Sequence, residues 1–157
     1  SRDVENAPEV IVLHYVGNNH YNWLQSRLPV NQIIFLRGCN NKIMSNYLDD
    51  GEKAKCVSDH KLYWKQMMLE GLGDGRYVLK SMKTNKYLCC MQDGTAKFVG
   101  DNRGEHLSQA LTIEQQEDKY FIVSCVTPRN VLQCHKHNGS VRFDNQNRRG
   151  WEAFRIE

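Results

Sequence analysis

Short apolar runs separated by turn-forming residues recur along most of the 157-residue chain. The clearest stretch runs from Gly73 to Gly94, where apolar runs at residues 77–79 and 87–90 are bracketed by Asp-Gly pairs. This pattern predicts β-strands joined by tight turns, because glycine readily adopts the positive φ that such turns need.

The same turn and strand residues recur on either side of this stretch. Three turn glycines and three glutamates recur at spacings of 43 to 45 residues: Gly51, Gly94 and Gly139, and Glu70, Glu114 and Glu157. A unit of about 40 residues with four short strands cannot bury its apolar face alone, so we expect three copies packed around one axis. A propeller needs about four or more blades. The sequence therefore predicts a closed all-β barrel of three four-stranded repeats.

The fourth strand of each repeat is expected at residues 64–70, 108–114 and 151–157, where apolar and polar residues alternate. Residues 63–72 also contain many helix formers, and a helix is the competing interpretation there. We predict a strand, because the matching segments of the other two repeats are rich in β-forming residues.

These repeats predict one domain at residues 32–157, divided into 32–75, 76–118 and 119–157. Residues 1–31 are expected to form a polar tail and an extra hairpin or arm, with the hairpin between residues 10 and 24. In an alternative register this hairpin begins the first repeat, and part of the chain after it is an insertion.

Overall charge and hydropathy exclude few functions. The formal net charge of +3 is too small to indicate nucleic-acid binding by itself. No apolar run approaches the roughly 18 residues of a membrane span, and no signal-peptide pattern opens the chain. The six cysteines lack CxxC spacing, and Cys90 and Cys134 occupy matching positions where a strand would bury them. Free thiols in a cytoplasmic protein are therefore expected, with a secreted, disulfide-linked protein as the alternative.

Motifs within the repeats resemble the β-trefoils of the fascin-like, actin-crosslinking group, which includes hisactophilin. The motif reads Val-Leu-Lys-Ser at residues 78–81, Asn-Lys-Tyr-Leu at 85–88, Asp-Gly at 93–94 and Trp-Glu-Ala-Phe-Arg-Ile at 151–156. The resemblance extends over residues 32–157 and implies a β-trefoil fold and a cytoskeletal partner. Parts of the same motif are also similar to amaranthin-type plant lectins and to fibroblast growth factors.

Catalytic and metal-binding chemistry have little support in the sequence. The aspartates sit in expected turns, where they cap backbone N–H groups. Cys134 and His135 are adjacent, but the cysteine falls at an expected core position without an orienting partner. His135 and His137 are fewer than the three or four protein ligands that zinc usually takes. We expect no enzyme activity, no metal and no cofactor.

Positive charge gathers in the third repeat, which carries seven basic residues against three acidic ones, whereas six of each sign cancel in each of the other repeats. This imbalance would steer an acidic partner to the third repeat. The proposed basic patch consists of Arg129, His135, Lys136, His137, Arg142, Arg148 and Arg149. An ordinary solvated surface with uneven charge is the competing interpretation.

The leading hypothesis is a non-enzymatic interaction module that docks this patch on an acidic protein surface such as an actin filament. Crosslinking would need a second binding face, or a homodimer formed through the N-terminal hairpin. The first alternative is a glycan-binding, lectin-type trefoil that stacks sugar rings on Tyr87, Tyr120 or Trp23. The second is a secreted growth-factor-like ligand, which would carry several disulfides.

Overall fold

The computed structural model describes residues 28–47, 52–100, 103 and 106–157. The hairpin expected between residues 10 and 24 lies outside the described residues. Thirteen strands and three one-turn 3-10 helices form in the described part of the chain. The strands are β1 (Ile33–Ile34), β2 (Leu36–Arg37), β3 (Ile43–Tyr47), β4 (Lys53–Ser58), β5 (Met67–Gly73), β6 (Arg76–Ser81), β7 (Tyr87–Cys90), β8 (Ala96–Val99), β9 (Leu111–Gln116), β10 (Lys119–Ser124), β11 (Val131–Cys134), β12 (Val141–Asn145) and β13 (Arg155–Ile156). The 3-10 helices are η3 (Tyr63–Lys65), η4 (Leu107–Gln109) and η5 (Gly150–Glu152).

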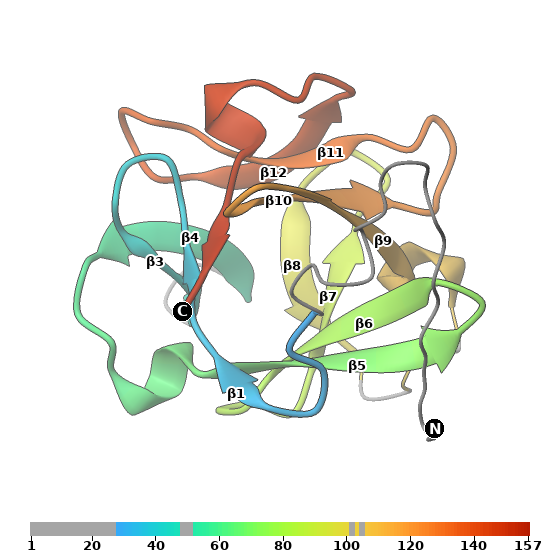
Figure 1. The fold of residues 1–157 in the computed structure, drawn as a ribbon, viewed down its shortest axis with the longest axis horizontal. Coiled ribbons are helices and arrows are strands. Elements are labelled where there is room, and N and C mark those ends of the chain that lie inside the picture. The colour runs from blue at the N-terminus through green and yellow to red at the C-terminus, as the bar shows by residue number, and fades with distance from the viewer. Residues whose placement is uncertain (1–27, 48–51, 101–102, 104–105) are drawn as a thin grey trace, which may run out of the picture.

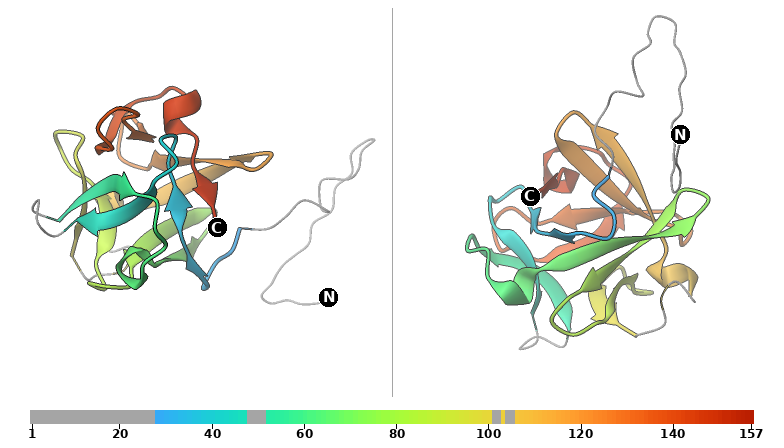
Figure 2. Two further views of the ribbon diagram at one scale, coloured as in Figure 1. Left: turned by 90° about the vertical axis from the view of Figure 1, so that its left-hand side faces the viewer. Right: turned by 60° about the horizontal axis from the view of Figure 1, so that its bottom comes forward.

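The strands form a closed ring with threefold repetition (Figures 1 and 2). The last strand of each repeat pairs antiparallel with the first strand of the next: β5 with β6, β9 with β10, and β13 with β2. The third pairing closes the ring, because it joins the end of the described chain to its beginning. This arrangement confirms the all-β fold class expected from the repeated pattern.

The first expected strand is divided between two partners. β1 pairs with β5, whereas β2 pairs with β13. Between them, Phe35 exchanges backbone hydrogen bonds with Glu157, at 2.9 Å in each direction. The chain therefore bends at Phe35 as it passes from one neighbouring strand to the other.

Three hairpins cap one end of the ring, and their second strands β4, β8 and β12 meet one another (Figure 1). Each contact is anchored by a backbone N–H group that donates to a turn carbonyl of another repeat, at 2.7 to 2.9 Å: Cys56 to Gly139, Phe98 to Glu52, and Phe143 to Gly94.

The accepting residues all have positive φ, at 75° for Gly139, 89° for Gly94 and 70° for Glu52. In the first repeat this position therefore falls on Glu52, one residue after the Gly51 that the spacing aligned with the other glycines. A Cβ added to Gly139 would lie 2.2 Å from the carbonyl oxygen of Cys56. Close approach of two backbones, as well as the turn, therefore requires glycine at this position.

Matching apolar residues of the three repeats fill the core. Leu36, Leu79 and Ile122 form one set, and Met44, Leu88 and Leu132 form another, all at most 3% exposed. Cys134 is fully buried as expected, whereas Cys90, predicted to match it, is only partly buried at the edge of the core.

Each expected fourth strand starts later than the alternating pattern predicted. A 3-10 turn at η3, η4 and η5 precedes β5, β9 and β13, and its last residue is a buried polar one: Lys65, Gln109 or Glu152. Buried polar side chains need hydrogen-bond partners, and Lys65 Nζ donates to the Ser58 carbonyl at 3.0 Å. The competing helix at residues 63–72 is therefore wrong beyond the three residues of η3.

Candidate functional site around Trp151

Trp151 lies partly exposed on η5, which packs against β11. The His135 ring packs against it with a centroid separation of 4.6 Å, and the His137 ring lies 6.0 Å away. The two histidine rings are 5.8 Å apart, and the backbone N–H of His137 donates to His135 Nδ1 at 3.3 Å. The indole is thus held on one side by an aromatic cluster.

A hollow of about 420 Å³ lies beside the indole, and we call it the Trp151 hollow. It is lined by Gln133, Asn145, Asn147, Arg149, Gly150, Trp151 and Glu152. Three of these seven residues carry amide side chains, which both donate and accept hydrogen bonds.

Local hydrogen bonds position the amides and the turn. Asn145 Nδ2 donates to Gln133 Oε1 at 3.1 Å, and the backbone N–H of Asn147 donates to Asn145 Oδ1 at 2.9 Å. The buried Glu152 carboxylate accepts the backbone N–H of Arg149 at 2.8 Å. These contacts fix the walls of the hollow before any ligand binds.

A second hollow of about 600 Å³ lies beside the same residues Gly150 and Trp151, and we call it the Cys39 hollow. Its lining also includes Gly38, Cys39, Asn41, Asp118, Lys119, Lys136, Ala153 and Arg155. Trp151 therefore stands between two surface depressions, one lined by amides and one of mixed charge.

A third hollow of about 510 Å³ lies between the β7–β8 turn and the β10–β11 loop, bordered by Asp93 and Asp144.

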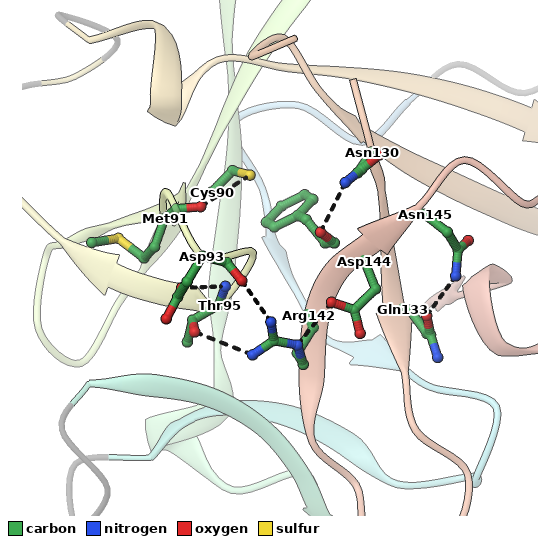
Figure 3. Close-up of polar contacts among 10 residues, drawn as sticks. Cys90, Met91, Asp93, Thr95, Asn130, Gln133, Arg142, Asp144 and Asn145 are labelled. Atoms are coloured by element: carbon green, nitrogen blue, oxygen red, sulfur yellow. Dashed lines mark hydrogen bonds and ion pairs between the residues drawn. The ribbon is translucent and has the colours of Figure 1, made fainter. Parts of the chain in front are cut away.

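Figure 3 shows Arg142 spanning the neighbouring strands. Its Nη2 donates to the Asp93 carbonyl at 2.6 Å, its Nη1 to Thr95 Oγ1 at 3.3 Å, and its Nε to Asp144 Oδ1 at 2.8 Å. Hydrogen bonds from Thr95 lower the pKa of Asp93, and Arg142 adds to this shift. Arg142 thus connects the second and third repeats, and Asp144 offsets its charge.

The seven residues of the predicted basic patch lie in three separate places and not on one surface. Arg148 forms a bidentate ion pair with Glu114, at 2.9 Å for both contacts. These hydrogen bonds lower the pKa of Glu114. Arg129 lies beside the same strand, where its Nη2 donates to Thr112 Oγ1 at 3.1 Å. Arg142 lies at the cap. The remaining four line the Trp151 hollow or the Cys39 hollow, or contact the Trp151 ring: His135, Lys136, His137 and Arg149. That these seven residues bind a partner stays a prediction.

Sequence reasoning missed the part of the site that is not basic. Trp151 was expected within a strand, and the amides of Gln133, Asn145 and Asn147 were not singled out. The available signal was the concentration of asparagine and glutamine at residues 145–147, close to a tryptophan.

Two aromatic residues proposed for sugar stacking do not serve that role. Tyr87 is 6% exposed and Tyr120 is 9% exposed, so their rings are covered by other side chains. The third, Trp23, lies outside the described residues.

The part of the chain that the structure describes holds neither a metal-binding cluster nor a membrane-spanning helix. No group of three or more histidine, cysteine, aspartate or glutamate side chains is placed to hold a metal ion there. No helix among the same residues is both long and apolar enough to cross a membrane. None of the six cysteines, all of which are described, forms a disulfide.

The sequence matches no protein-family profile and no curated protein. Solved structures do match: a designed threefold-symmetric protein, ThreeFoil, has 18% identity and a TM-score of 0.66 over 79% of this chain and 96% of its own. A Polyporus squamosus lectin, solved with the epitope Neu5Acα2-6Galβ1-4GlcNAc, has 15% identity and a TM-score of 0.68 over 83% of this chain and 50% of its own. A Clostridium perfringens endo-β-galactosidase that releases GlcNAcα1-4Gal has 15% identity and a TM-score of 0.68 over 79% of this chain and 32% of its own.

This chain thus spans about half the length of the lectin and a third of that of the galactosidase. Structural similarity at identities this low shows the fold alone, so the fascin-like group stays a prediction. Together with the threefold ring of strands, this similarity shows that the chain has the β-trefoil fold.

Proposed function

We propose that this chain is a binding module whose ligand is a glycan held in the Trp151 hollow. The observation that carries the proposal is a partly exposed indole beside three amide side chains in one depression. In this proposal the chain binds its ligand without catalysing a reaction.

The chemistry of the hollow suits a sugar ring. One face of a pyranose is formed by C–H groups and stacks on a flat aromatic surface, while the hydroxyl groups at its edge both donate and accept hydrogen bonds. Trp151 offers the aromatic surface, and Gln133, Asn145 and Asn147 offer matching polar groups. Few polar groups in a largely preformed depression are typical of a small-ligand site.

Two further points support a glycan. His135 and His137 hold the indole in place, so little side-chain freedom is lost when a ligand binds. The lectin with a similar fold was solved with a glycan epitope, which makes glycans the first ligand class to screen.

The test is a glycan array probed with the full chain at physiological salt. The proposal expects a limited set of bound glycans, and it expects Trp151→Ala to remove those signals. Trp64→Ala is the matched control, because Trp64 occupies the same position on η3 that Trp151 occupies on η5. Signals that persist in Trp151→Ala would place the ligand elsewhere and contradict the proposal.

A second candidate function, docking on an acidic protein surface such as an actin filament, has one specific observation in its favour. Lys136 and Arg149 line the two depressions beside Trp151, and neither forms an ion pair with a described carboxylate. Co-sedimentation with filaments at increasing salt tests it. Docking predicts binding that weakens with salt and is lost in the double variant Lys136→Glu and Arg149→Glu. The Arg148→Glu variant is the comparison, since Glu114 already neutralises that residue. Filaments that pellet without the protein at low salt would overturn this candidate.

A further inference from the structure

Three thiols from different parts of the chain meet beneath Gly38. Cys39 lies in the turn after β2, Cys56 on β4 and Cys134 at the end of β11. A Cβ added to Gly38 would lie 2.8 Å from Cys134 Sγ and 3.2 Å from Cys56 Sγ. The Cys39 thiol donates to the Cys134 carbonyl oxygen at 3.2 Å. Glycine at position 38 therefore leaves the room in which the sulfur atoms gather.

The three thiols differ in their access to solvent. Cys56 and Cys134 are both 0% exposed, whereas Cys39 is partly exposed and lines the Cys39 hollow. A small solute that enters this hollow meets Cys39 first, with Cys134 next to it.

Hydrogen bonding and burial give the thiols of the cluster different pKa values. A hydrogen bond from the Cys56 thiol is the main reason that the pKa of Cys134 falls to about 7. Burial is the main reason that the pKa of Cys39 rises to about 11. The thiolate is the nucleophilic form of cysteine, so near neutral pH Cys134 is the main thiolate of the cluster, although it is 0% exposed and can attack only a group placed beside it.

We propose that Cys39 and Cys134 form an oxidative modification site in which hydrogen peroxide, entering through the Cys39 hollow, converts the two thiols to an intramolecular disulfide. In the first step the exposed Cys39 gives up its proton and its thiolate attacks one peroxide oxygen. The O–O bond breaks, Cys39 becomes a sulfenic acid, and the leaving hydroxide takes up the released proton as water.

In the second step the Cys134 thiolate attacks the Cys39 sulfur. The S–S bond forms as the S–O bond breaks, and the departing hydroxide takes up the proton released by Cys134. Two thiols and one peroxide thus give one disulfide and two waters, and each sulfur loses one electron. Cys56 donates its hydrogen bond to Cys134 before the reaction and forms no new bond.

The disulfide would tie the turn at residues 38–42 to the end of β11, and so the first repeat to the third. Trp151 lines the same hollow as Gly38 and Cys39, so oxidation would alter the surface on one side of the indole. The chemical inference does not depend on the proposed glycan ligand, and its test uses no ligand.

Peptide mapping tests the inference directly. Trypsin places the three cysteines on separate peptides, residues 38–42 for Cys39, 56–61 for Cys56 and 130–136 for Cys134. The full chain is treated with hydrogen peroxide or left reduced, its remaining thiols are blocked with N-ethylmaleimide under denaturing conditions, and it is digested and analysed by mass spectrometry. We expect a linked peptide pair that joins residues 38–42 to 130–136 only after oxidation, with two of the six thiols lost. Dithiothreitol should reverse the link.

Two variants provide the controls. Cys39→Ser should abolish the linked pair, whereas Cys125→Ser, at a partly exposed thiol outside the cluster, should leave it unchanged. A link between Cys56 and Cys134, a link between two molecules, or unchanged thiols after peroxide treatment would each overturn the proposal. The experiment on the unsubstituted chain decides the matter even if a variant folds poorly.

Discussion

Single residues hold the three repeats together at the cap. Gly139 shows how little room is left there for a side chain. Its carbonyl accepts the Cys56 N–H at 2.8 Å, and its missing side chain lets the two backbones approach. The sequence indicated a turn glycine there, because Asn-Gly pairs form tight turns. It did not reveal the packing against Cys56, which lies 83 residues earlier in the chain.

Gly139→Ala should destabilise the fold far more than a second glycine replacement. Gly75 also has positive φ, at 81°, but no atom lies within 4 Å of an added Cβ there. Gly75→Ala should cost about 1 kcal/mol from backbone strain alone, whereas Gly139→Ala should cost more than ~3 kcal/mol because the cap must also move. Urea unfolding of both variants measures the difference. Equal losses would show that the close approach at the cap does not matter.

At the scale of elements, the ring closes where β13 meets β2, and a charged network spans that junction. Arg37 Nε donates to Glu157 Oε2 at 2.5 Å and Arg37 Nη2 to Oε1 at 2.9 Å, while Lys61 Nζ lies 2.8 Å from Oε1. The hydrogen bond from Arg37 is the main reason that the pKa of Glu157 falls from 4.5 to about 2. Alternation of apolar residues predicted the strands, but the partners across this junction are 120 residues apart, and no local pattern specifies them.

The Glu157 network predicts a defined loss of stability in acid. The pKa of Glu157 is lower in the folded chain than in the unfolded one, so the network stabilises the fold above about pH 4.5 and this contribution is lost as the pH falls toward 2. We expect Glu157→Gln to lower the free energy of unfolding by about 1 to 2 kcal/mol at pH 7, after allowance for solvent screening.

The difference between the unsubstituted chain and Glu157→Gln should shrink as the pH approaches 2. Denaturant unfolding at several pH values measures it. Glu117→Gln, at an exposed carboxylate without an ion pair among the described residues, is the control and should change little. A pH-independent difference between Glu157→Gln and the unsubstituted chain would rule out this network as its source.

At the scale of the whole molecule, spacing and alternation predicted a closed barrel of three repeats, because every repeat must bury the same positions in one core, and the family resemblance implied the β-trefoil. Leu79 and Leu88 lie in the core as expected, with matching residues from the other repeats. The site was predicted only in part. His135, Lys136, His137 and Arg149 gather around Trp151, but charge alone did not separate them from Arg142 and Arg148, which form ion pairs with acidic residues. Which charges are neutralised depends on contacts between repeats, and the sequence does not show these.

The closed ring predicts that residues 28–157 fold without the preceding segment. Every strand pairing that closes the ring lies within these residues. A chain that begins at Leu28 should unfold in urea within about 1 kcal/mol of the longer chain, since no core contact among the described residues is removed. A much larger loss, or the loss of cooperative unfolding, would favour the register in which the N-terminal hairpin belongs to the first repeat.

Calorimetric titration with the strongest glycan from the array tests the central claim most directly, by comparing Trp151→Ala with Trp64→Ala. If the Trp151 hollow holds the ligand, Trp151→Ala should weaken binding by about 30-fold, the equivalent of ~2 kcal/mol for a central aromatic contact. Trp64→Ala should bind as the unsubstituted chain does. Equal affinity in the unsubstituted chain and Trp151→Ala, with both proteins folded, would contradict the account.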